Sequence, residues 1–312
     1  MIEDRFTRWF DQFVQEWSPA EGEPDFSESK VFRFRSGYNE KPTVREILKA
    51  FCEHDAAIET EAIIIGMDDD FTYGHSSAPI IELLAENRDR LPRLKGLYIG
   101  EIEQEENEIS WINNCDMTPL LVEFPGLEEL RIRGGNGLAF QPTRHICLKK
   151  LVIETGGLDK SVLPPLLESV FPELQHLELW LGDDYYGWNG SAEDVRPFFY
   201  QNPYPKLNYL GIKNCIHQNE IAKLAADAPV LEQIETLDLG AGTLRDEGGE
   251  ALLNSENVRS LKHLDLSHHF LCDEMMVRFE SSDLSDVVNL DDQEEPDDWG
   301  DGENHYYISV SE

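Results

Sequence analysis

Metal-ligand side chains gather in one stretch near the end of the sequence. His263 and Asp265 stand two residues apart, and His268, His269 and Asp273 follow closely. Imidazole and carboxylate groups are ligands of zinc and of other divalent cations, which can activate a bound water molecule. A metal-dependent enzyme or hydrolase that uses the His263/Asp265 cluster is therefore one hypothesis for this chain.

Geometry limits that hypothesis. If Asp238 and Asp265 lie on adjacent strands, their carboxylates are about 5 Å apart, where they repel, raise one pKa or attract a cation. His176 and Glu178 would lie three strands away, at about 4.8 Å per strand, too far to share an ion with His263. Because no residue supplies the remaining ligands unambiguously, we predict neither a metal nor a cofactor.

Other catalytic motifs do not occur in the sequence. The glycine-rich run 133–137 lacks the Lys-Ser/Thr pair of a phosphate-binding loop, and there is no Gly-x-Ser-x-Gly elbow. The cysteines are odd in number and form no Cys-x-x-Cys pair, which disfavours a disulfide framework or a zinc knuckle; they stand at 52, 115, 147, 215 and 272. We interpret the chain as non-catalytic.

A repeated apolar pattern indicates the elements that position these side chains. Leu-x-x-Leu-x-Leu, with Ile in some places, recurs with starts at residues 94, 127, 148, 174, 207, 234 and 261. The last two apolar residues of each copy are two apart, so they point to one face of a short strand and into the core. The longer spacings leave room for a return helix, as at 219–226 and 244–253, whereas the 21-residue spacing is too short for one.

The positions after each strand depart from the usual repeat. The recurring pattern resembles that of leucine-rich repeats, which carry Asn or Cys three residues after the third apolar position, where the side chain closes the turn. Here those places hold Ile102, Gly135, Gly156, Gly182, Cys215, Gly242 and His269. Glycine cannot supply the side-chain hydrogen bond, so we expect less regular turns.

Regions on either side of the repeats divide the chain. Residues 1–60 are predicted to form an N-terminal cap with a loose acidic connector at 18–29, and residues 61–285 the solenoid. A strand is predicted at 31–35 and 61–66, and a helix at 43–54 and at 77–88, the latter capped by Ser77. Residues 286–312 form an acidic tail, in which the alternation of Tyr306, Ile308 and Val310 favours a docking strand.

The charge balance restricts the partner. The 62 acidic residues outnumber the 26 Lys and Arg residues, giving a net charge of −36. Such a field repels nucleic acid and anionic membranes. The first residues, Met1–Phe6, are acidic where a signal peptide is basic, and no apolar run approaches about 18 residues, so we predict a cytoplasmic protein.

Several repeat segments carry a resemblance to known proteins. The last two repeats, with 237–239, 246–248, 264–266 and 273–275, resemble the ribonuclease-inhibitor-like class of leucine-rich repeats. Segments 108–112, 131–135 and 177–182 resemble a bacterial leucine-rich-repeat family of unassigned activity, over about residues 60–312. The resemblance implies a curved α/β horseshoe with a parallel sheet on its concave face, helices and irregular loops on its convex face, and protein binding. It carries over no catalytic residue.

The side chains that alternate with the core leucines should line the concave face. Exposed aromatic residues beside arginine are typical of protein-binding hot spots, although a mixed polar face can also serve only to keep the solenoid soluble. The loop at 183–188 is read either as a recognition loop or as a hydrophobic plug that closes a long repeat. The predicted partner-binding residues are Tyr98, Arg131, Arg133, Glu178, Trp180, Asp183, Tyr185, Tyr186, Trp188, Tyr209, Lys213, Asp238, His263 and Asp265.

The favoured interpretation is a non-catalytic module that binds another protein through the concave face, with the metal-dependent enzyme as the alternative.

Overall fold

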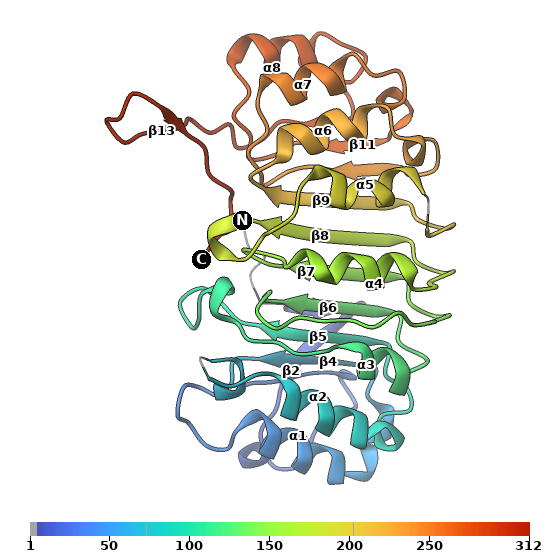
Figure 1. Cartoon of the computed structure of the whole chain (residues 1–312). Helices are drawn as coiled ribbons and strands as arrows, with labels where there is room; N and C mark the ends of the chain where they lie inside the picture. Colours follow the sequence, from blue (N-terminus) through green and yellow to red (C-terminus); the bar gives the residue numbers. More distant parts are fainter. Residues whose placement is uncertain (1–4, 73, 202) are drawn as a thin grey trace. The chain divides into compact units, whose positions relative to one another are not determined.

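The computed structural model describes residues 5–72, 74–201 and 203–312 (Figure 1). Residues 1–4, which contributed to the signal-peptide argument, lie outside the described residues. The chain divides into two compact units. The N-terminal unit extends to Glu154 and includes Glu168–Glu173, and the C-terminal unit comprises Thr155–Leu167 and Leu174–Ser311.

The N-terminal unit is a ladder of parallel strands, β2 to β7, in sequence order. β1 forms an antiparallel hairpin with β2. The strands are β1 (Arg8–Trp9), β2 (Gln12–Glu16), β3 (Val31–Phe34), β4 (Ala62–Gly66), β5 (Gly96–Glu101), β6 (Glu129–Arg133) and β7 (Lys150–Glu154). The helices are α1 (Val44–Glu53), α2 (Ala78–Glu86) and α3 (Thr118–Glu123), and they lie on one side of these strands (Figure 1).

The C-terminal unit alternates strand and helix more regularly, and β8 to β12 are parallel. Its strands are β8 (His176–Gly182), β9 (Tyr209–Cys215), β10 (Thr236–Asp238), β11 (His263–Asp265) and β12 (Val288–Asn289). Its helices are α4 (Leu163–Glu168), α5 (Ala192–Tyr200), α6 (Gln218–Ala226), α7 (Asp246–Leu253) and α8 (Asp273–Glu280). The acidic tail forms a small hairpin of β13 (Asp297–Asp298) and β14 (Asn304–His305).

Short 3-10 helices occupy several of the connections. They are η1 (Pro19–Glu21), η2 (Asp55–Glu59), η3 (Asp69–Phe71), η4 (Arg88–Arg90), η5 (Ile109–Trp111), η6 (Lys160–Val162), η7 (Asp184–Tyr186), η8 (Pro229–Glu232) and η9 (Val258–Ser260).

The repeated leucines form columns across each ladder. Leu97 pairs in register with Leu130, and Leu130 with Leu151. In the C-terminal unit, the same position is held by Leu177, Leu210, Leu237 and Leu264 in successive strands. All of these side chains are fully buried. The predicted α/β leucine-rich-repeat solenoid is thus confirmed.

Local signals in the sequence explain several helix boundaries. α1 begins with a capping box between Thr43 and Glu46, as the prediction at 43–54 requires. α2 begins at Ala78 as predicted, but the Ser77 hydroxyl does not cap it. That hydroxyl donates instead to Asn114 Oδ1 at 3.2 Å, so the capping role of Ser77 is corrected. No α-helix separates β6 from β7, as the short spacing predicted.

Two of the irregular turns are closed by side chains after all. Cys215 Sγ accepts the His217 N–H at 3.3 Å, and His269 Nδ1 accepts the Leu271 N–H at 3.2 Å. His269 also contacts the Leu290 carbonyl through Nε2 at 3.1 Å. An imidazole therefore takes the place that Asn or Cys usually holds in a leucine-rich repeat.

The end of the chain docks, but not as the predicted strand. The Val310 N–H donates to Asn214 Oδ1 at 3.0 Å, and Asn214 Nδ2 donates to the Val310 carbonyl at 2.6 Å. Ile308 and Val310 are buried but lie in no strand, since the strands of the tail hairpin are 297–298 and 304–305. The last residues therefore contact Asn214 of β9 without forming the expected strand.

None of the described helices has the length and apolar character needed to span a bilayer.

Candidate functional site

In each unit, one side of the strands carries the helices, and we call the opposite side the helix-free face. In the N-terminal unit this face holds Tyr98, Arg131 and Arg133, as the strand alternation predicted. The expectation that they are exposed is wrong, because their exposed fractions are 1%, 7% and 2%. They do not offer an open surface in this structure.

The two arginines are held by carboxylates from neighbouring strands. Arg133 Nε donates to Glu154 Oε2 at 2.8 Å, and Arg131 Nε donates to Glu129 Oε1 at 2.8 Å. The Tyr98 hydroxyl also donates to Glu154 Oε2, at 3.2 Å. Burial and the Glu154 charge raise the pKa of Tyr98, so it stays a hydrogen-bond donor. Complete pairing lets these charges remain inside the fold.

The N-terminal segment, residues 5–10, covers this part of the face. Phe6 packs against Tyr98 with ring centroids 5.5 Å apart, and the Arg131 guanidinium lies 4.9 Å from the Phe6 ring. Trp9 is buried and its indole N–H donates to Glu129 Oε2 at 3.1 Å. Together with Val31, Ala62 and Ile64, these aromatic side chains form a core on the helix-free face.

The helix-free face of the C-terminal unit carries the second group of predicted residues. The expected exposure of Trp180 and Asp238 is wrong as well, because their exposed fractions are 7% and 3%. Trp180 Nε1 donates to Glu178 Oε1 at 2.6 Å, and His176 Nε2 lies 3.2 Å from Glu178 Oε2. The His176 and Tyr209 rings stack with centroids 3.8 Å apart. Although burial alone would raise it, hydrogen bonds from His176 and Trp180 and the Lys213 charge lower the pKa of Glu178 to about 2.

Lys213 and Asp238 form the centre of this group. Lys213 Nζ donates to Asp238 Oδ2 at 2.5 Å, and the Tyr209 hydroxyl donates to the same oxygen at 2.5 Å. Burial and the charges of Asp265 and Glu178 raise the pKa of Asp238 despite Lys213. We call Glu178, Trp180, Tyr209, Lys213 and Asp238 the polar cluster.

The predicted Asp238–Asp265 pairing is confirmed, since the two residues are register partners on β10 and β11. The cation attracted there is the ammonium group of Lys213. Asp265 accepts the Ser267 N–H at 2.8 Å through Oδ1 and the Asn289 side-chain amide at 3.3 Å through Oδ2. The carboxylate is therefore already engaged by hydrogen-bond donors.

The His263/Asp265 stretch does not assemble a set of metal ligands. His263 is exposed, while His269 is fully buried in its turn. Across 5–72, 74–201 and 203–312, no three His, Cys, Asp or Glu side chains group as metal ligands would.

The loop at 183–188 separates into an exposed and a buried part. Tyr185 is 90% exposed, whereas Trp188 is fully buried, with its ring against Gly190. Trp188 therefore acts as the hydrophobic plug of the loop, and the expectation that Trp188 lies on the binding surface is wrong. Asp183 caps η7, because its Oδ1 accepts the Tyr185 N–H at 2.8 Å. Tyr186, the last residue of η7, is half-buried.

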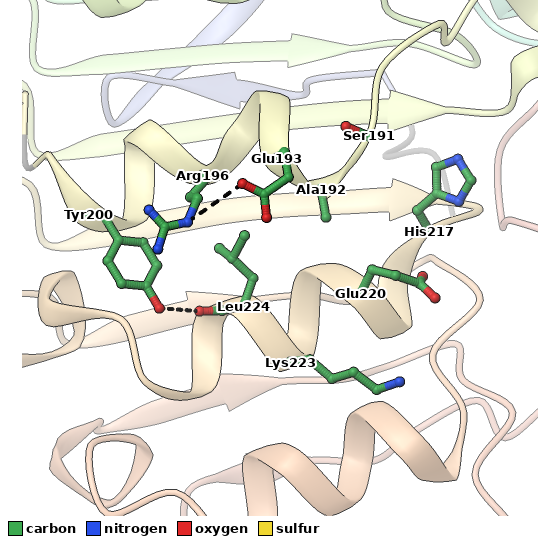
Figure 2. A pocket seen from close by; sticks show the side chains of 9 residues that line it. All are labelled: Ser191, Ala192, Glu193, Arg196, Tyr200, His217, Glu220, Lys223 and Leu224. Carbon is green, nitrogen blue, oxygen red and sulfur yellow. Dashed lines mark hydrogen bonds and ion pairs between the residues drawn. The ribbon is translucent and has the colours of Figure 1, made fainter.

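A groove of about 600 Å³ lies between α5 and α6 (Figure 2). Tyr200 donates its hydroxyl hydrogen to the Leu224 carbonyl at 3.1 Å, and Arg196 Nε lies 3.6 Å from Glu193 Oε2. Lys223 Nζ donates to Glu247 Oε2 at 2.6 Å. The cations at its wall are thus paired with carboxylates, and they do not converge on a common point in Figure 2.

Sequence reasoning missed the groove and the N-terminal segment. The groove residues come from two separate repeats and share no motif. The N-terminal segment did carry a signal, because Phe6, Trp9, Phe10, Phe13 and Trp17 make this stretch far more aromatic than a solvated cap requires.

Comparison with known proteins supports the fold. No protein-family model matches the sequence. No curated protein matches it either. A crystal structure of a protein from Bacteroides fragilis is similar, with a TM-score of 0.81 and 28% identity over 92% of this chain and 79% of that chain. An internalin from Listeria monocytogenes aligns over 91% of this chain and 60% of that chain, with a TM-score of 0.36 and 14% identity, a similarity too low to bear on this protein.

Proposed function

We propose that this chain is a non-catalytic protein-interaction module that binds a basic segment of another protein on the helix-free face of its C-terminal unit. The observation that carries the proposal is the polar cluster with its neighbour Asp265. Three carboxylates, those of Glu178, Asp238 and Asp265, surround one ammonium group, that of Lys213. An excess of negative charge remains for a cationic ligand.

Aromatic side chains add to this surface. Tyr209 and His176 present a stacked pair, and Lys213 lies 5.3 Å from the Trp180 ring. Aromatic groups beside charged groups are typical of the few residues that dominate binding energy. The proposed contact residues are the half-buried Glu178, Tyr209, Lys213 and Asp265 and the exposed His263 and Tyr185. The buried Trp180 and Asp238 hold Glu178, Lys213 and Tyr209 through hydrogen bonds, and the buried Tyr98, Arg131, Arg133 and Trp188 are not proposed as contacts.

The net charge of −36 agrees with a basic protein partner, and we expect neither nucleic acid nor an anionic membrane to bind. A cytoplasmic location remains a prediction from the sequence. The alternation of β9, α6, β10, α7, β11 and α8 favours the ribonuclease-inhibitor-like class for the last repeats.

The test is affinity capture from native lysate with the isosteric variant Glu178→Gln plus Asp265→Asn, at a temperature where circular dichroism shows this variant to be folded. We expect loss of a specific partner, with recovery from the wild-type chain falling as salt is raised, because both follow from charge attraction. The matched control, Glu247→Gln plus Glu256→Gln, changes net charge equally at exposed carboxylates away from the cluster. Equal recovery by both variants would reject the assigned face.

A further inference from the structure

The main chain of the N-terminal segment is held from both sides. The Phe6 N–H donates to Glu101 Oε1 at 2.8 Å, and the Phe6 carbonyl accepts from Arg33 Nη2 at 2.7 Å. Arg33 and Glu101 also bind each other through two hydrogen bonds, of 2.5 and 2.9 Å, and both are buried. This paired clamp contacts the main-chain N–H and C=O of one residue, and neither contact depends on the side chain of that residue.

The side chains of the N-terminal segment bind at separate sites on the helix-free face. The Phe6 ring lies between Tyr98 and Arg131, and the Trp9 indole bonds to Glu129. Gly96 leaves room for the Trp9 and Phe10 rings, because a Cβ at Gly96 would lie 3.0 Å from the Trp9 ring and 2.4 Å from the Phe10 ring. The sheet lacks a side chain just where the aromatic groups rest.

Arg5, which precedes Phe6, adds a charged contact to those of the N-terminal segment. Arg5 Nη2 lies 2.7 Å from Glu103 Oε2 and 2.7 Å from Glu106 Oε1. The segment is tied to the ladder through β1, which pairs with β2 at two positions, Arg8 with Phe13 and Trp9 with Gln12, and through the Val14 N–H, which donates to the Thr7 carbonyl at 3.0 Å. Its anchorage through β-pairing is therefore short compared with its contacts on the helix-free face.

We propose that the helix-free face of the N-terminal unit is a recognition surface for an extended segment of another protein with the pattern basic–Phe–x–x–Trp, and that residues 5–10 are its displaceable resident occupant. Main-chain hydrogen bonds combined with side-chain pockets are how proteins read extended peptides. This surface belongs to a different unit from the polar cluster, so the inference does not depend on the proposed function.

The experiment opens the surface in the full chain with Phe6→Ser plus Trp9→Ser. The probe is a fluorescent peptide with the sequence of residues 5–11, followed by anisotropy. We expect saturable binding to the variant, and at least about tenfold weaker binding to the wild-type chain, because a tethered segment competes at roughly millimolar effective concentration.

Three controls make the result specific. Phe13→Ser changes an aromatic residue that is 62% exposed in the same hairpin and should behave as the wild type. Adding Gly96→Leu to the double variant should abolish binding by filling the Trp9 position. A peptide with serine at positions 6 and 9 should not bind. Failure of the folded double variant to bind, or equal binding of the serine peptide, would overturn the proposal.

Hydrogen exchange on the wild-type chain tests the proposal even if the double variant does not fold. A displaceable segment opens without unfolding the ladder, so the Phe6 amide should exchange its hydrogen at least 100-fold faster than the amides of β5. Equal exchange rates would show that the segment opens only on global unfolding, and would overturn the proposal as well.

Discussion

Buried charge is handled at the residue scale by complete pairing. The Glu154 carboxylate accepts hydrogen bonds from Tyr98, Arg131 and Arg133. The Asp238 carboxylate accepts hydrogen bonds from Lys213 and Tyr209. A buried ion that lost its partner would cost several kcal/mol, so single replacements at these places act far beyond the bond they remove.

Glu178→Gln should destabilise the chain in a pH-dependent manner. A pKa lowered from 4.5 to about 2 corresponds to roughly 3 kcal/mol at neutral pH, partly offset because Asp238 loses a repelling neighbour. The contribution is present above about pH 4.5 and is lost as the pH falls toward 2. Urea unfolding should therefore show a difference between wild type and variant that shrinks to about half by pH 3. A difference independent of pH would contradict this assignment.

Gly182→Ala should be strongly destabilising because of a backbone contact. The residue has φ of 87°, and a Cβ there would lie 2.0 Å from the Gly156 carbonyl oxygen. Gly22→Ala is the matched control, with φ of 84° and open space around it. Thermal unfolding should show a loss of about 1–3 kcal/mol for the control, from its backbone conformation alone, and at least about 2 kcal/mol more for Gly182→Ala. Similar losses would mean that the loop relaxes.

At the scale of elements, the repeat pattern was sufficient to predict strands β5 to β11 and the side of each that enters the core, but not the short strands β1, β2 and β12, which lie outside the repeats. It could also predict α1, α6 and α7, because their apolar spacing and polar boundaries are local properties. The repeat pattern could not predict that Tyr98 and Arg133 are buried. Strand alternation says which face a side chain is on, but only tertiary structure says whether another segment lies there.

The docked C-terminal segment should be separable from the repeats. Ile308→Ser plus Val310→Ser removes its two buried apolar side chains and leaves Asn214 without the close approach that its hydrogen bonds need. We expect faster proteolysis after residue 305 and faster exchange of the Val310 amide. Trp299→Ser, at a residue 71% exposed on the tail hairpin, should leave both unchanged. Unaltered protection in the double variant would mean that the contacts of Tyr306 and Tyr307 suffice.

At the scale of the whole molecule, charge is the dominant property. With a net charge of −36, repulsion opposes the compact state and decreases as salt screens it. The melting temperature should therefore rise by several degrees between about 20 and 300 mM NaCl, and equally in KCl. A falling melting temperature would show that attractive ion pairs, such as Arg278 with Glu250, outweigh the general repulsion.

The clamp of Arg33 and Glu101 also has a polarity. It offers an acceptor to the amide hydrogen of position 6 and a donor to the carbonyl of the same residue. A strand laid down in the reverse orientation would set carbonyl against carboxylate and amide against guanidinium, so a ligand with the right side chains in backward order should be refused. Proline at that position, which has no amide hydrogen, should be refused for the same reason.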